Sequence, residues 1–462
     1  MNASPIEPQR LQTLNRARCR PDGEHVLYWM QGSQREAFNP ALEHAVHRAN
    51  ELSLPLRVVF ALTADYPEAN QRHFRFMLEG LRETARHLGR RGIRFEIEPG
   101  DPAEVALRAA RRAALVVCDR GYLPPHRAWR ETLAQGATCP VEQVEGDVVV
   151  PVEVASERPE VAARTLRPRL LRHLSRFLKA LPRQEVAFPL KPGPELDVEG
   201  LLTTLTGLDR SVAPVERHFI GGPDEARRRF EGFLERGLAA WQAGRNHPHT
   251  DQVSQMSPYL HFGQVSPVWL ALRAEEAAGP DEQDALNAFL EQLVVRRELA
   301  FNHAAHNPAP TLWQGLPGWA RQTLMEHRAD PRAALYTEEQ LLEARTHDPY
   351  WNAAMLEMRH TGYMHNYMRM YWGKKILEWT SDPEEAWDRT LRFNNRFLLD
   401  GRDPVSWGSV GWVFGLHDRP WPSRAVFGTV RSMTAGGLER KTDPRAYVLK
   451  VQGRLAGEAP PG

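Results

Sequence analysis

The sequence predicts two domains: an α/β domain built on a doubly wound, Rossmann-like parallel sheet, and after it an all-α domain. Between residues 25 and 150, short apolar and β-branched runs alternate with stretches of helical pattern. Strands that alternate with helices in this way form parallel sheets covered by helices. From residue 223 onward helix signals dominate, and the 462 residues of the chain are enough for two or more domains.

The strand signals of the first domain are runs of apolar side chains at residues 25–30, 56–62, 93–98, 114–118 and 141–150. Helical patterns fall between them, at residues 41–51, 71–90, 102–112 and 125–135. The loop after the first strand reads QGSQR at residues 31–35. The glycine-rich fingerprint of dinucleotide-binding sheets is therefore absent from this domain.

The domain boundaries follow from composition. Residues 1–24 are polar, contain several arginines and lack the apolar run of a signal peptide, so we expect a disordered N-terminus before the domain at residues 25–150. Residues 151–220, rich in proline and polar residues between 181 and 197, are expected to connect the two domains. In the helical domain, residues 221–462, cap-then-proline pairs mark helix starts at residues 257–258, 266–267, 348–349 and 382–383.

Overall composition is ordinary for a globular protein, with 42% hydrophobic and 25% charged residues. The net charge of +1 excludes a globally basic protein, so any nucleic-acid surface must be a local patch. Cys19, Cys118 and Cys139 have no metal-ligand or disulfide spacing, so we expect no metal site and a reducing compartment. No apolar run is long enough to span a membrane, and we therefore expect a cytoplasmic protein without membrane contact.

The most informative stretch is residues 363–379, which we predict to be one helix because it contains good helix formers and no proline. His365, Arg369, Trp372 and Trp379 recur at spacings of three and four or their multiples, so they share one face. An aromatic stripe at this spacing is commonly part of a core. A cation one turn before two indoles also suits a buried anionic redox cofactor and a path for electrons to leave it, and the pattern alone leaves both interpretations open.

Two further strings stand on either side of this helix, THDPYWN at residues 346–352 and NNRFLLDGRDP at residues 394–404. Together with the helix they resemble the flavin-binding half of the photolyase and cryptochrome family, and most closely the class II cyclobutane pyrimidine dimer photolyases. The resemblance extends in order from about residue 26 to residue 447. It implies a monomeric enzyme that carries FAD in its helical domain and uses blue light to repair pyrimidine dimers in UV-damaged DNA.

The resemblance also assigns a light-harvesting antenna chromophore, a deazaflavin or a folate, to the α/β domain. Class II members usually read Asp-Asn-Trp where this chain has Phe38, Asn39 and Pro40. This departure leaves both the presence and the identity of the antenna open.

For FAD, the resemblance implies that the string SQMSPYLHFG at residues 254–263 holds the diphosphate with hydroxyls and a helix N-terminus. Arg369 and Asp400 resemble the salt bridge beside the flavin ring, and Asn394 the residue that faces flavin N5. An asparagine can accept a hydrogen bond from a protonated N5 or donate to a deprotonated one. Trp241 stands where the family usually has a tyrosine, so one phosphate contact is lost. The implied cofactor-binding residues are Trp241, Ser254, Gln255, Met256, Ser257, Asn366, Arg369, Asp400 and Asn394.

For electron transfer, Trp372, Trp351 and Trp379 resemble the triad that runs from flavin to surface in that order. The lesion must be flipped out of the duplex into a pocket. The residues implied to act on it as catalytic residues are Gln292, Asn394, Trp412 and Met370, and those implied to contact DNA are Arg245, Asn246, Arg419 and Arg431. The loop at residues 415–421 corresponds to the one that fills the gap left by the flipped bases.

Gln292 is the most consequential departure from the class II pattern, which has a glutamate that contacts the dimer. Photolyases for (6-4) photoproducts and many cryptochromes carry glutamine there. A neutral amide can donate a hydrogen bond to a carbonyl but cannot supply a proton. His303 and His306 lie near the expected pocket, either as surface histidines or as proton donors. Three hypotheses therefore stay open: repair of cyclobutane dimers, repair of another lesion such as the (6-4) photoproduct, and a cryptochrome-like photoreceptor.

Overall fold

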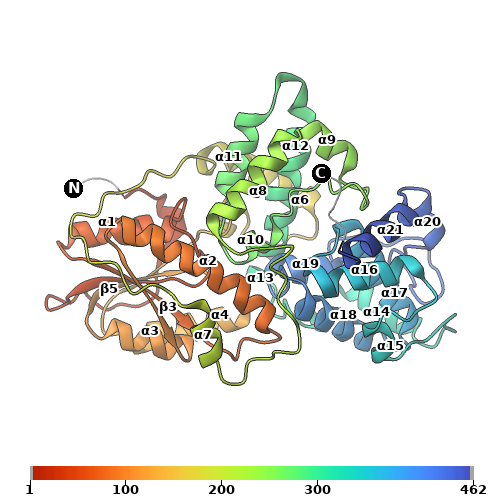
Figure 1. The fold of residues 1–462 in the computed structure, drawn as a ribbon, viewed down its shortest axis with the longest axis horizontal. Helices are drawn as coiled ribbons and strands as arrows, with labels where there is room; N and C mark the ends of the chain where they lie inside the picture. Colours follow the sequence, from red (N-terminus) through yellow and green to blue (C-terminus); the bar gives the residue numbers. More distant parts are fainter. Residues whose placement is uncertain (1–3, 458–462) are drawn as a thin grey trace.

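The computed structural model describes residues 4–457, in which an α/β part lies beside a larger set of helices (Figure 1). The sheet has six strands in the order β1-β6-β5-β2-β3-β4. All neighbours pair in parallel except β1 with β6. The strands are β1 (Leu11–Thr13), β2 (His25–Trp29), β3 (Leu56–Leu62), β4 (Arg94–Pro99), β5 (Ala113–Asp119) and β6 (Val141–Val144). The predicted doubly wound sheet is confirmed.

Helices cover both faces of this sheet, and they are α1 (Pro40–Glu51), α2 (Gln71–Arg90), α3 (Pro102–Ala110) and α4 (Pro124–Gly136). Helices α1 and α2 cover one face, and α3 and α4 the other (Figure 1). Alternate strand residues explain this, because Val26 and Tyr28 pack against the first pair while Leu27 and Trp29 pack against the second. Each helix begins and ends within two residues of its predicted bounds.

The prediction of a disordered segment over residues 1–24 is wrong for residues 8–13. A short 3₁₀ helix, η1 (Pro8–Arg10), leads into β1, which pairs antiparallel with β6. The Arg10 guanidinium is buried and donates hydrogen bonds to the carbonyl oxygens of Glu145, Val148 and Val149. The polar composition of the segment hides a strand whose partner lies some 130 residues away. Residues 1–3 lie outside the described residues.

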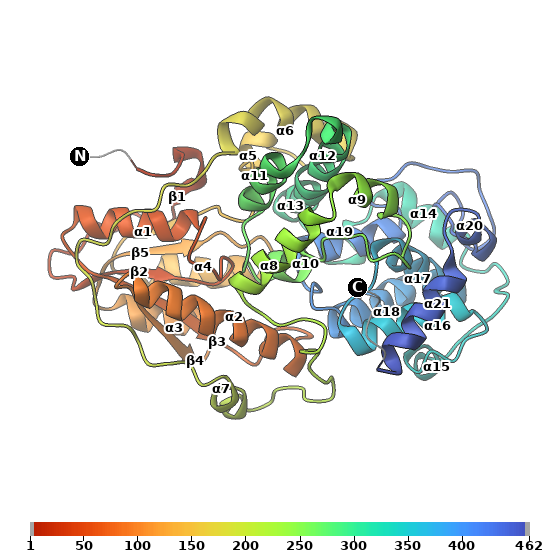
Figure 2. The same ribbon diagram turned by 45° about the horizontal axis from the view of Figure 1, so that its top comes forward.

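The predicted connection at residues 151–220 contains helices of its own, α5 (Val152–Ala155), α6 (Ala163–Phe177) and α7 (Val198–Thr204). After α6 the chain runs back along the α/β part as an extended segment before α7 packs near α2 (Figure 2). The proline-rich stretch between residues 181 and 197 therefore has no regular structure, as predicted, whereas α6 was not anticipated.

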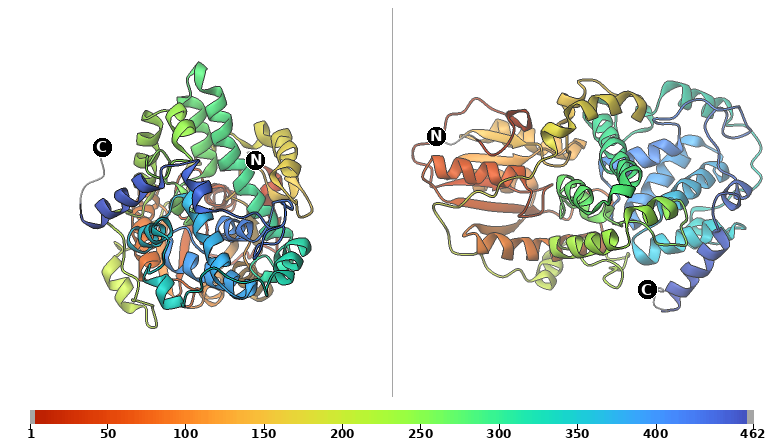
Figure 3. Two further views of the ribbon diagram at one scale, coloured as in Figure 1. Left: turned by 90° about the vertical axis from the view of Figure 1, so that its right-hand side faces the viewer. Right: turned by 90° about the horizontal axis from the view of Figure 1, so that it is seen from above.

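The rest of the chain is helical, and Figure 3 shows these helices gathered beyond one end of the sheet. They are α8 (Pro223–Glu235), α9 (Leu238–Gly244), α10 (Ser257–His261), α11 (Pro267–Ala277), η2 (Pro280–Glu282), α12 (Gln283–Leu290), η3 (Glu291–Arg296), α13 (Arg297–His306), η4 (Trp313–Gly315), α14 (Gly318–Glu326), α15 (Glu338–Leu342), α16 (Pro349–Thr361), α17 (Asn366–Trp379), α18 (Pro383–Phe397), α19 (Pro404–Val413), α20 (Ala435–Glu439) and α21 (Pro444–Leu455). The predicted all-α architecture is confirmed. Among residues 4–457, no helix has the length and apolar character needed to cross a bilayer.

The helix predicted over residues 363–379 begins three residues later than expected. Helix α16 ends at Thr361 and is followed by Gly362, which adopts φ 71°, and α17 starts at Asn366. His365 is the N-cap of α17, and its Nδ1 accepts a hydrogen bond from the Tyr367 N–H at 3.2 Å. His365 therefore does not belong to the helical stripe, although its ring is buried at the start of it.

Candidate flavin and DNA site

The buried ion pair between Arg369 and Asp400 lies at the centre of the helical part. Arg369 is on α17, and Asp400 is in the turn after α18. The Nη2 group of Arg369 donates to both carboxylate oxygens, at 3.1 and 3.0 Å. Both residues are less than 10% exposed. A buried pair of this kind is costly to desolvate, which makes it weak evidence for stability alone and leaves room for a role in binding a ligand.

Asn394, on α18, has one amide atom without a partner. Its Nδ2 donates to Ser406 Oγ and Asn395 Oδ1, at 2.5 and 3.1 Å. Its Oδ1 is buried and has no hydrogen-bond partner within residues 4–457. A buried acceptor left unpaired costs about 1–3 kcal/mol. The geometry therefore fits a ligand that brings a donor to this oxygen, as the N5 position of a flavin would.

Three buried nitrogens also lack a hydrogen-bond partner in the described part of the chain, and they come from the start and the middle of α17. They are Arg369 Nε, His365 Nε2 and Trp372 Nε1. Burial lowers the pKa of His365 to about 4, so this ring is neutral near pH 7. Unpaired donors are rare in native interiors, so these three nitrogens suit a ligand that accepts hydrogen bonds. Together with the Asn394 oxygen they form a donor and acceptor set that fits a polar heteroaromatic group such as the flavin of FAD.

The string expected to hold the diphosphate, residues 254–263, contains α10, a helix of only five residues. Ser254, Gln255 and Ser257 are half-buried and Met256 is buried. Gln255 has φ 54°, a left-handed conformation that turns the chain just before the helix. A single helical turn has a small dipole, so the groups that this segment offers to a phosphate are mainly its hydroxyls.

Trp241 closes the same region from α9. Its indole is buried and meets the ring of Phe289 edge-on, at 5.5 Å between centroids. The Arg245 guanidinium lies 4.9 Å from the centre of the Trp241 ring, in a cation–π contact. Arg245 is half-buried, and the neighbouring Asn246 is exposed, as is Asn366 at the start of α17. Where the family usually has a tyrosine, this chain thus has an indole that contacts an arginine.

Trp351 of α16 lies between the two tryptophans of α17. Its Nε1 donates a hydrogen bond to the backbone carbonyl of Trp372 at 3.0 Å, and its ring contacts Trp379 with 5.5 Å between centroids. All three indoles are at most 2% exposed. Trp379 contacts Tyr336 and the exposed His347 beyond it. The order Trp372, Trp351, Trp379 is therefore a continuous path that begins beside Arg369 and approaches the surface.

Trp412, on α19, is half-buried and has two cationic side chains close to its ring. The Lys374 Nζ lies 5.3 Å from the ring centre of Trp412, and the Arg431 guanidinium 5.2 Å. Lys374 is fully buried and donates to the carbonyl of Val413, and burial lowers its pKa to about 7. Sequence reasoning missed this lysine, because the pair Lys374-Lys375 reads as solvated charge. Met370, one turn before on α17, is also half-buried.

An ion pair between Arg431 and Asp418 anchors the loop at residues 415–421. Arg431 donates to both oxygens of Asp418, at 2.8 and 2.9 Å, and lies 4.2 Å from the centre of the Trp421 ring. The exposed Arg419 guanidinium lies 5.6 Å from the centre of the same ring. Arg431 is thus partly neutralised, whereas Arg419 presents its charge to solvent.

Gln292 is exposed on η3, a segment of π-helix between α12 and α13. Such π-helical segments are rare and often occur at functional sites. His303 is buried, against one of the two expectations for it, and its ring meets that of His417 with 5.6 Å between centroids. Burial lowers the pKa of His303 to about 4, so the ring is neutral near pH 7 and is no ready proton donor. His306 binds the carbonyl of Ser156 at 2.9 Å.

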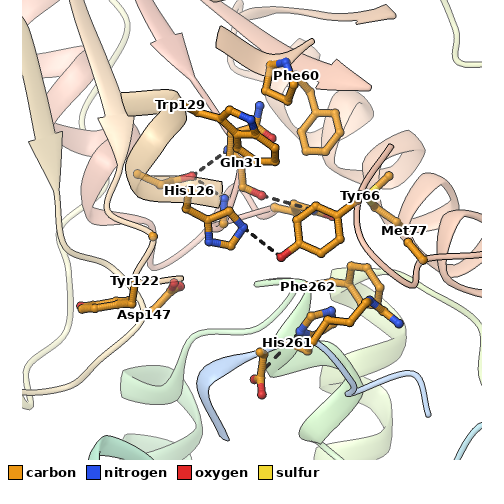
Figure 4. Close-up of a pocket in the computed structure, with 18 of the residues that line it drawn as sticks. Gln31, Phe60, Tyr66, Met77, Tyr122, His126, Trp129, Asp147, His261 and Phe262 are labelled. Carbon is orange, nitrogen blue, oxygen red and sulfur yellow. Dashed lines mark hydrogen bonds and ion pairs between the residues drawn. The ribbon is translucent and has the colours of Figure 1, made fainter. Parts of the chain in front are cut away.

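A separate cavity of about 160 Å³ lies between the α/β part and the helices (Figure 4). It is at the carboxyl ends of β2, β3 and β5, where the strand order reverses and α/β sheets bind ligands. Tyr66, His126 and Trp129 form an aromatic wall with ring centroids 5.5–6.1 Å apart. His261, the last residue of α10, and Phe262 after it close the cavity from the helical side. Sequence reasoning did not identify Tyr66, His126 or Trp129, and it placed His261 and Phe262 in the diphosphate string.

Asp119 explains why the usual phosphate loop is absent from this sheet. Its Oδ2 accepts hydrogen bonds from the backbone N–H groups of Gln31, Gly32 and Ser33, at 2.9, 2.9 and 3.0 Å. These are the groups that a dinucleotide phosphate would bind in a Rossmann domain. A carboxylate of the chain itself thus occupies the anion position. Asn39, in the string that departs from class II, caps α1 through the N–H of Leu42.

A family model for DNA photolyase matches residues 26–187 of the chain. The deoxyribodipyrimidine photo-lyase of Methanothermobacter thermautotrophicus is 45% identical over 97% of this chain and 99% of that protein. The proteins of the same name from Oryza sativa subsp. japonica and Potorous tridactylus are 38% and 35% identical. They align with 97% and 92% of this chain and with 91% and 81% of their own lengths.

Among solved structures, a class III photolyase from Agrobacterium tumefaciens superposes with a TM-score of 0.69 at 19% identity, covering 94% of this chain and 87% of that one. A cryptochrome from Synechocystis sp. PCC6803 gives 0.71 at 16% identity, covering 94% and 89%. At these identities the two structures share the fold with this chain. The relatives above 30% identity align along nearly its whole length, and the chain therefore belongs to the DNA photolyase family.

Proposed function

We propose that the chain repairs pyrimidine dimers in UV-damaged DNA with blue light and FAD. The observation that carries this proposal is the unpaired Oδ1 of Asn394 beside the buried Arg369–Asp400 pair, where the tryptophan path begins. FAD would supply the light-driven one-electron chemistry that splits the dimer. Near-full-length similarity to deoxyribodipyrimidine photo-lyases supports the same reaction.

The residues proposed to hold FAD divide by the part of the cofactor they suit. Arg369, oriented by Asp400, is a buried cation that suits the flavin ring. Asn394 offers a hydrogen-bond acceptor to the polar edge of the flavin. The hydroxyls of Ser254 and Ser257 suit the diphosphate, next to Gln255 and Met256. Trp241 and Asn366 border this region from α9 and from the start of α17.

The path Trp372, Trp351, Trp379 is proposed to return the oxidised cofactor to its active, reduced form. Its indoles are buried among apolar side chains. Within residues 4–457 neither the Trp372 ring nor the Trp351 ring has a cation–π contact, whereas Lys375 lies 5.7 Å from the centre of the Trp379 ring. Trp412 has Lys374 and Arg431 beside it. Nearby cations disfavour loss of an electron from an indole, so this difference favours Trp372 and Trp351 over Trp412 as electron donors.

The lesion pocket is proposed to have Trp412 and Met370 as walls and Gln292 as the polar contact. Half-buried aromatic and thioether side chains suit the faces of flipped bases. Lys374 holds Trp412 in place through the cation–π contact and through the carbonyl of the next residue, Val413. The phosphate contacts are proposed to come from Arg245, Asn246, Arg419 and Arg431.

Lesion preference is the part of the function that Gln292 decides. We expect Gln292→Glu to raise the number of cyclobutane dimers repaired per absorbed photon, because it restores a group that can carry a proton. Such help is typically worth about 10²–10⁴-fold when fully used. Repair yields at a measured photon dose on defined lesions are the readout. Gln283→Glu, which adds the same charge at an exposed position of α12, is the control. Unchanged or lower dimer repair in Gln292→Glu, with wild type repairing (6-4) photoproducts, would favour the second lesion.

DNA binding should depend on salt, because phosphate contacts dominate it. We expect Arg245→Ala and Arg419→Ala each to weaken binding to lesion-containing duplex and to lower the salt slope by about one phosphate contact. Binding isotherms at several salt concentrations give this slope. Arg111→Ala, an exposed arginine in the α/β part, should leave it unchanged. If Arg245→Ala and Arg419→Ala both keep the wild-type salt slope, a photoreceptor function gains support over repair.

The cavity between the α/β part and the helices is proposed as the antenna site, for a deazaflavin or a folate. Aromatic walls suit a planar chromophore, and burial lowers the pKa of His126 to about 4, so the Tyr66, His126 and Trp129 wall is uncharged near pH 7. We also propose that the protein is a cytoplasmic monomer, with domains at residues 25–150 and 221–462 joined by residues 151–220.

A further inference from the structure

Helix α6 and its flanks carry a concentrated positive charge to which the proposed function assigns no role. No acidic residue occurs between residues 161 and 184, although the chain as a whole has a net charge of only +1. The basic residues of this stretch are Arg164, Arg167, Arg169, Arg172, Arg176, Lys179 and Arg183. Some of these are neutralised by partners, such as Arg167 by Glu291 and Arg183 by Glu36.

The helix is anchored by one apolar face. Ala163, Leu166, Leu170 and Phe177 are buried in a cluster that also contains Val294 of η3 and Leu299 of α13. The basic residues lie on the other faces, so α6 presents its charge outward from a fixed position. Figure 2 shows the helix on the outer side of the molecule beside α12 and α13.

The outer side of α6 forms one wall of a surface hollow of about 630 Å³. Thr165, Pro168, Arg169 and Arg172 line it from the helix, at the spacing of one helical face. The other wall is the segment before the helix, with Arg158 and Val161 among its residues. Three arginines thus face a single space.

Glu160 is the one acidic residue lining the hollow, and it is buried. Its Oε1 lies 3.1 Å from Arg169 Nε and 3.9 Å from Arg158 Nε, and it accepts a hydrogen bond from Ser156 Oγ at 2.8 Å. Glu160 therefore orients Arg158 and Arg169. Arg172 has no salt bridge among residues 4–457, and an excess of positive charge remains.

The hollow adjoins the proposed lesion site on two sides. His417, in the loop expected to enter the DNA gap, donates from Nδ1 to the carbonyl of Val161 at 3.3 Å. Arg167 of α6 donates to both oxygens of Glu291, at 2.9 and 2.8 Å, and Glu291 is the neighbour of Gln292. DNA that presents a flipped base near Gln292 and His417 has its flanking backbone close to α6.

We propose that the hollow between α6 and Arg158 binds backbone phosphates of the duplex on one flank of the lesion. This inference rests on the proposed function, since it extends the DNA contact beyond the lesion pocket. Guanidinium groups match phosphate geometry, and contacts of this kind fix the position of a protein on DNA without reading sequence. Arg158 and Arg172 provide the contacts, and Glu160 with Arg169 shapes the site.

The test uses the double variant Arg158→Ala/Arg172→Ala, because neither side chain is buried and the Glu160–Arg169 pair stays intact. Binding is measured against salt on two duplexes with a central dimer, one of about 10 base pairs, a single helical turn, and one about three times longer. On the long duplex the salt slope should fall by about 1.8, since each phosphate contact contributes about 0.9. On the short duplex binding should stay as in wild type. The exposed pair Arg90→Ala/Arg111→Ala in the α/β part is the control.

An unchanged slope on the long duplex would overturn the proposal, and so would an equal loss on both duplexes, which would place the arginines at the lesion itself. Failure of the proposed function would look different: wild type would bind the long duplex through these arginines and repair nothing under light.

Discussion

Replacing Trp351 with phenylalanine is expected to slow photoreduction of bound oxidised flavin by about tenfold or more, a change equivalent to only ~1.4 kcal/mol of added barrier. Trp351 contacts Trp372 through its indole nitrogen and Trp379 through its ring, so it connects the two. Phenylalanine keeps much of the packing and removes the oxidisable indole. Flavin absorbance during blue illumination with an external reductant measures the rate.

Trp387→Phe is the matched control for this variant. Trp387 is a buried indole in the same core cluster, but its aromatic contacts are with Trp313 and Phe414. It should lose similar packing energy and keep the wild-type rate of photoreduction. Equal slowing in both variants would mean that packing, and not electron transfer, accounts for the effect of Trp351. If the Trp351→Phe variant photoreduces its flavin at the wild-type rate, the proposed role of the triad is wrong.

Replacing Arg369 with methionine is expected to yield protein without flavin and with about 3–5 kcal/mol less stability, the usual cost of leaving one partner of a buried ion pair. Asp400 would then place an uncompensated carboxylate beside the cofactor. Absorbance of the purified protein reports the flavin, and chemical denaturation of the flavin-free forms reports the free energy of unfolding. The double variant Arg369→Met/Asp400→Asn should regain much of the stability, because the charge is gone, yet still fail to retain flavin.

Arg389→Met separates the two effects. Arg389 is a buried arginine on α18 that pairs with Glu385 and contacts Thr380, away from Asn394 and Asp400. Its loss should lower stability while the protein still purifies with flavin. If Arg369→Met retains flavin as well as Arg389→Met does, Arg369 is a structural residue and the proposed cofactor site is wrong.

The parts of the fold that sequence reasoning predicted are those with local signals. Strand β3 and helix α2 have the predicted bounds because a nearly continuous apolar run marks the strand and Asn70 is the N-cap of the helix. The starts of α16 and α18 follow from Asp348 and Asp382, whose side chains accept from backbone N–H groups of the first turn. Such signals need no knowledge of distant contacts.

The parts that were missed depend on contacts between distant residues. Strand β1 exists because its partner is β6, and Arg10 reads as a surface charge until the carbonyls around Val149 are seen. Lys374 looks solvated in sequence and is buried under Trp412. In the candidate site, the place of Trp351 between two tryptophans of another helix came from resemblance alone and required the structure to be seen.

Light-driven repair is measured by illuminating the purified protein, reconstituted with FAD and reduced, with a duplex that contains one cyclobutane dimer. We expect blue light to restore intact pyrimidines in many turnovers per protein, darkness to give none, and the Arg369→Met variant to be inactive in both conditions. If flavin-loaded protein repairs neither the dimer nor the (6-4) photoproduct under light, the proposed function is wrong.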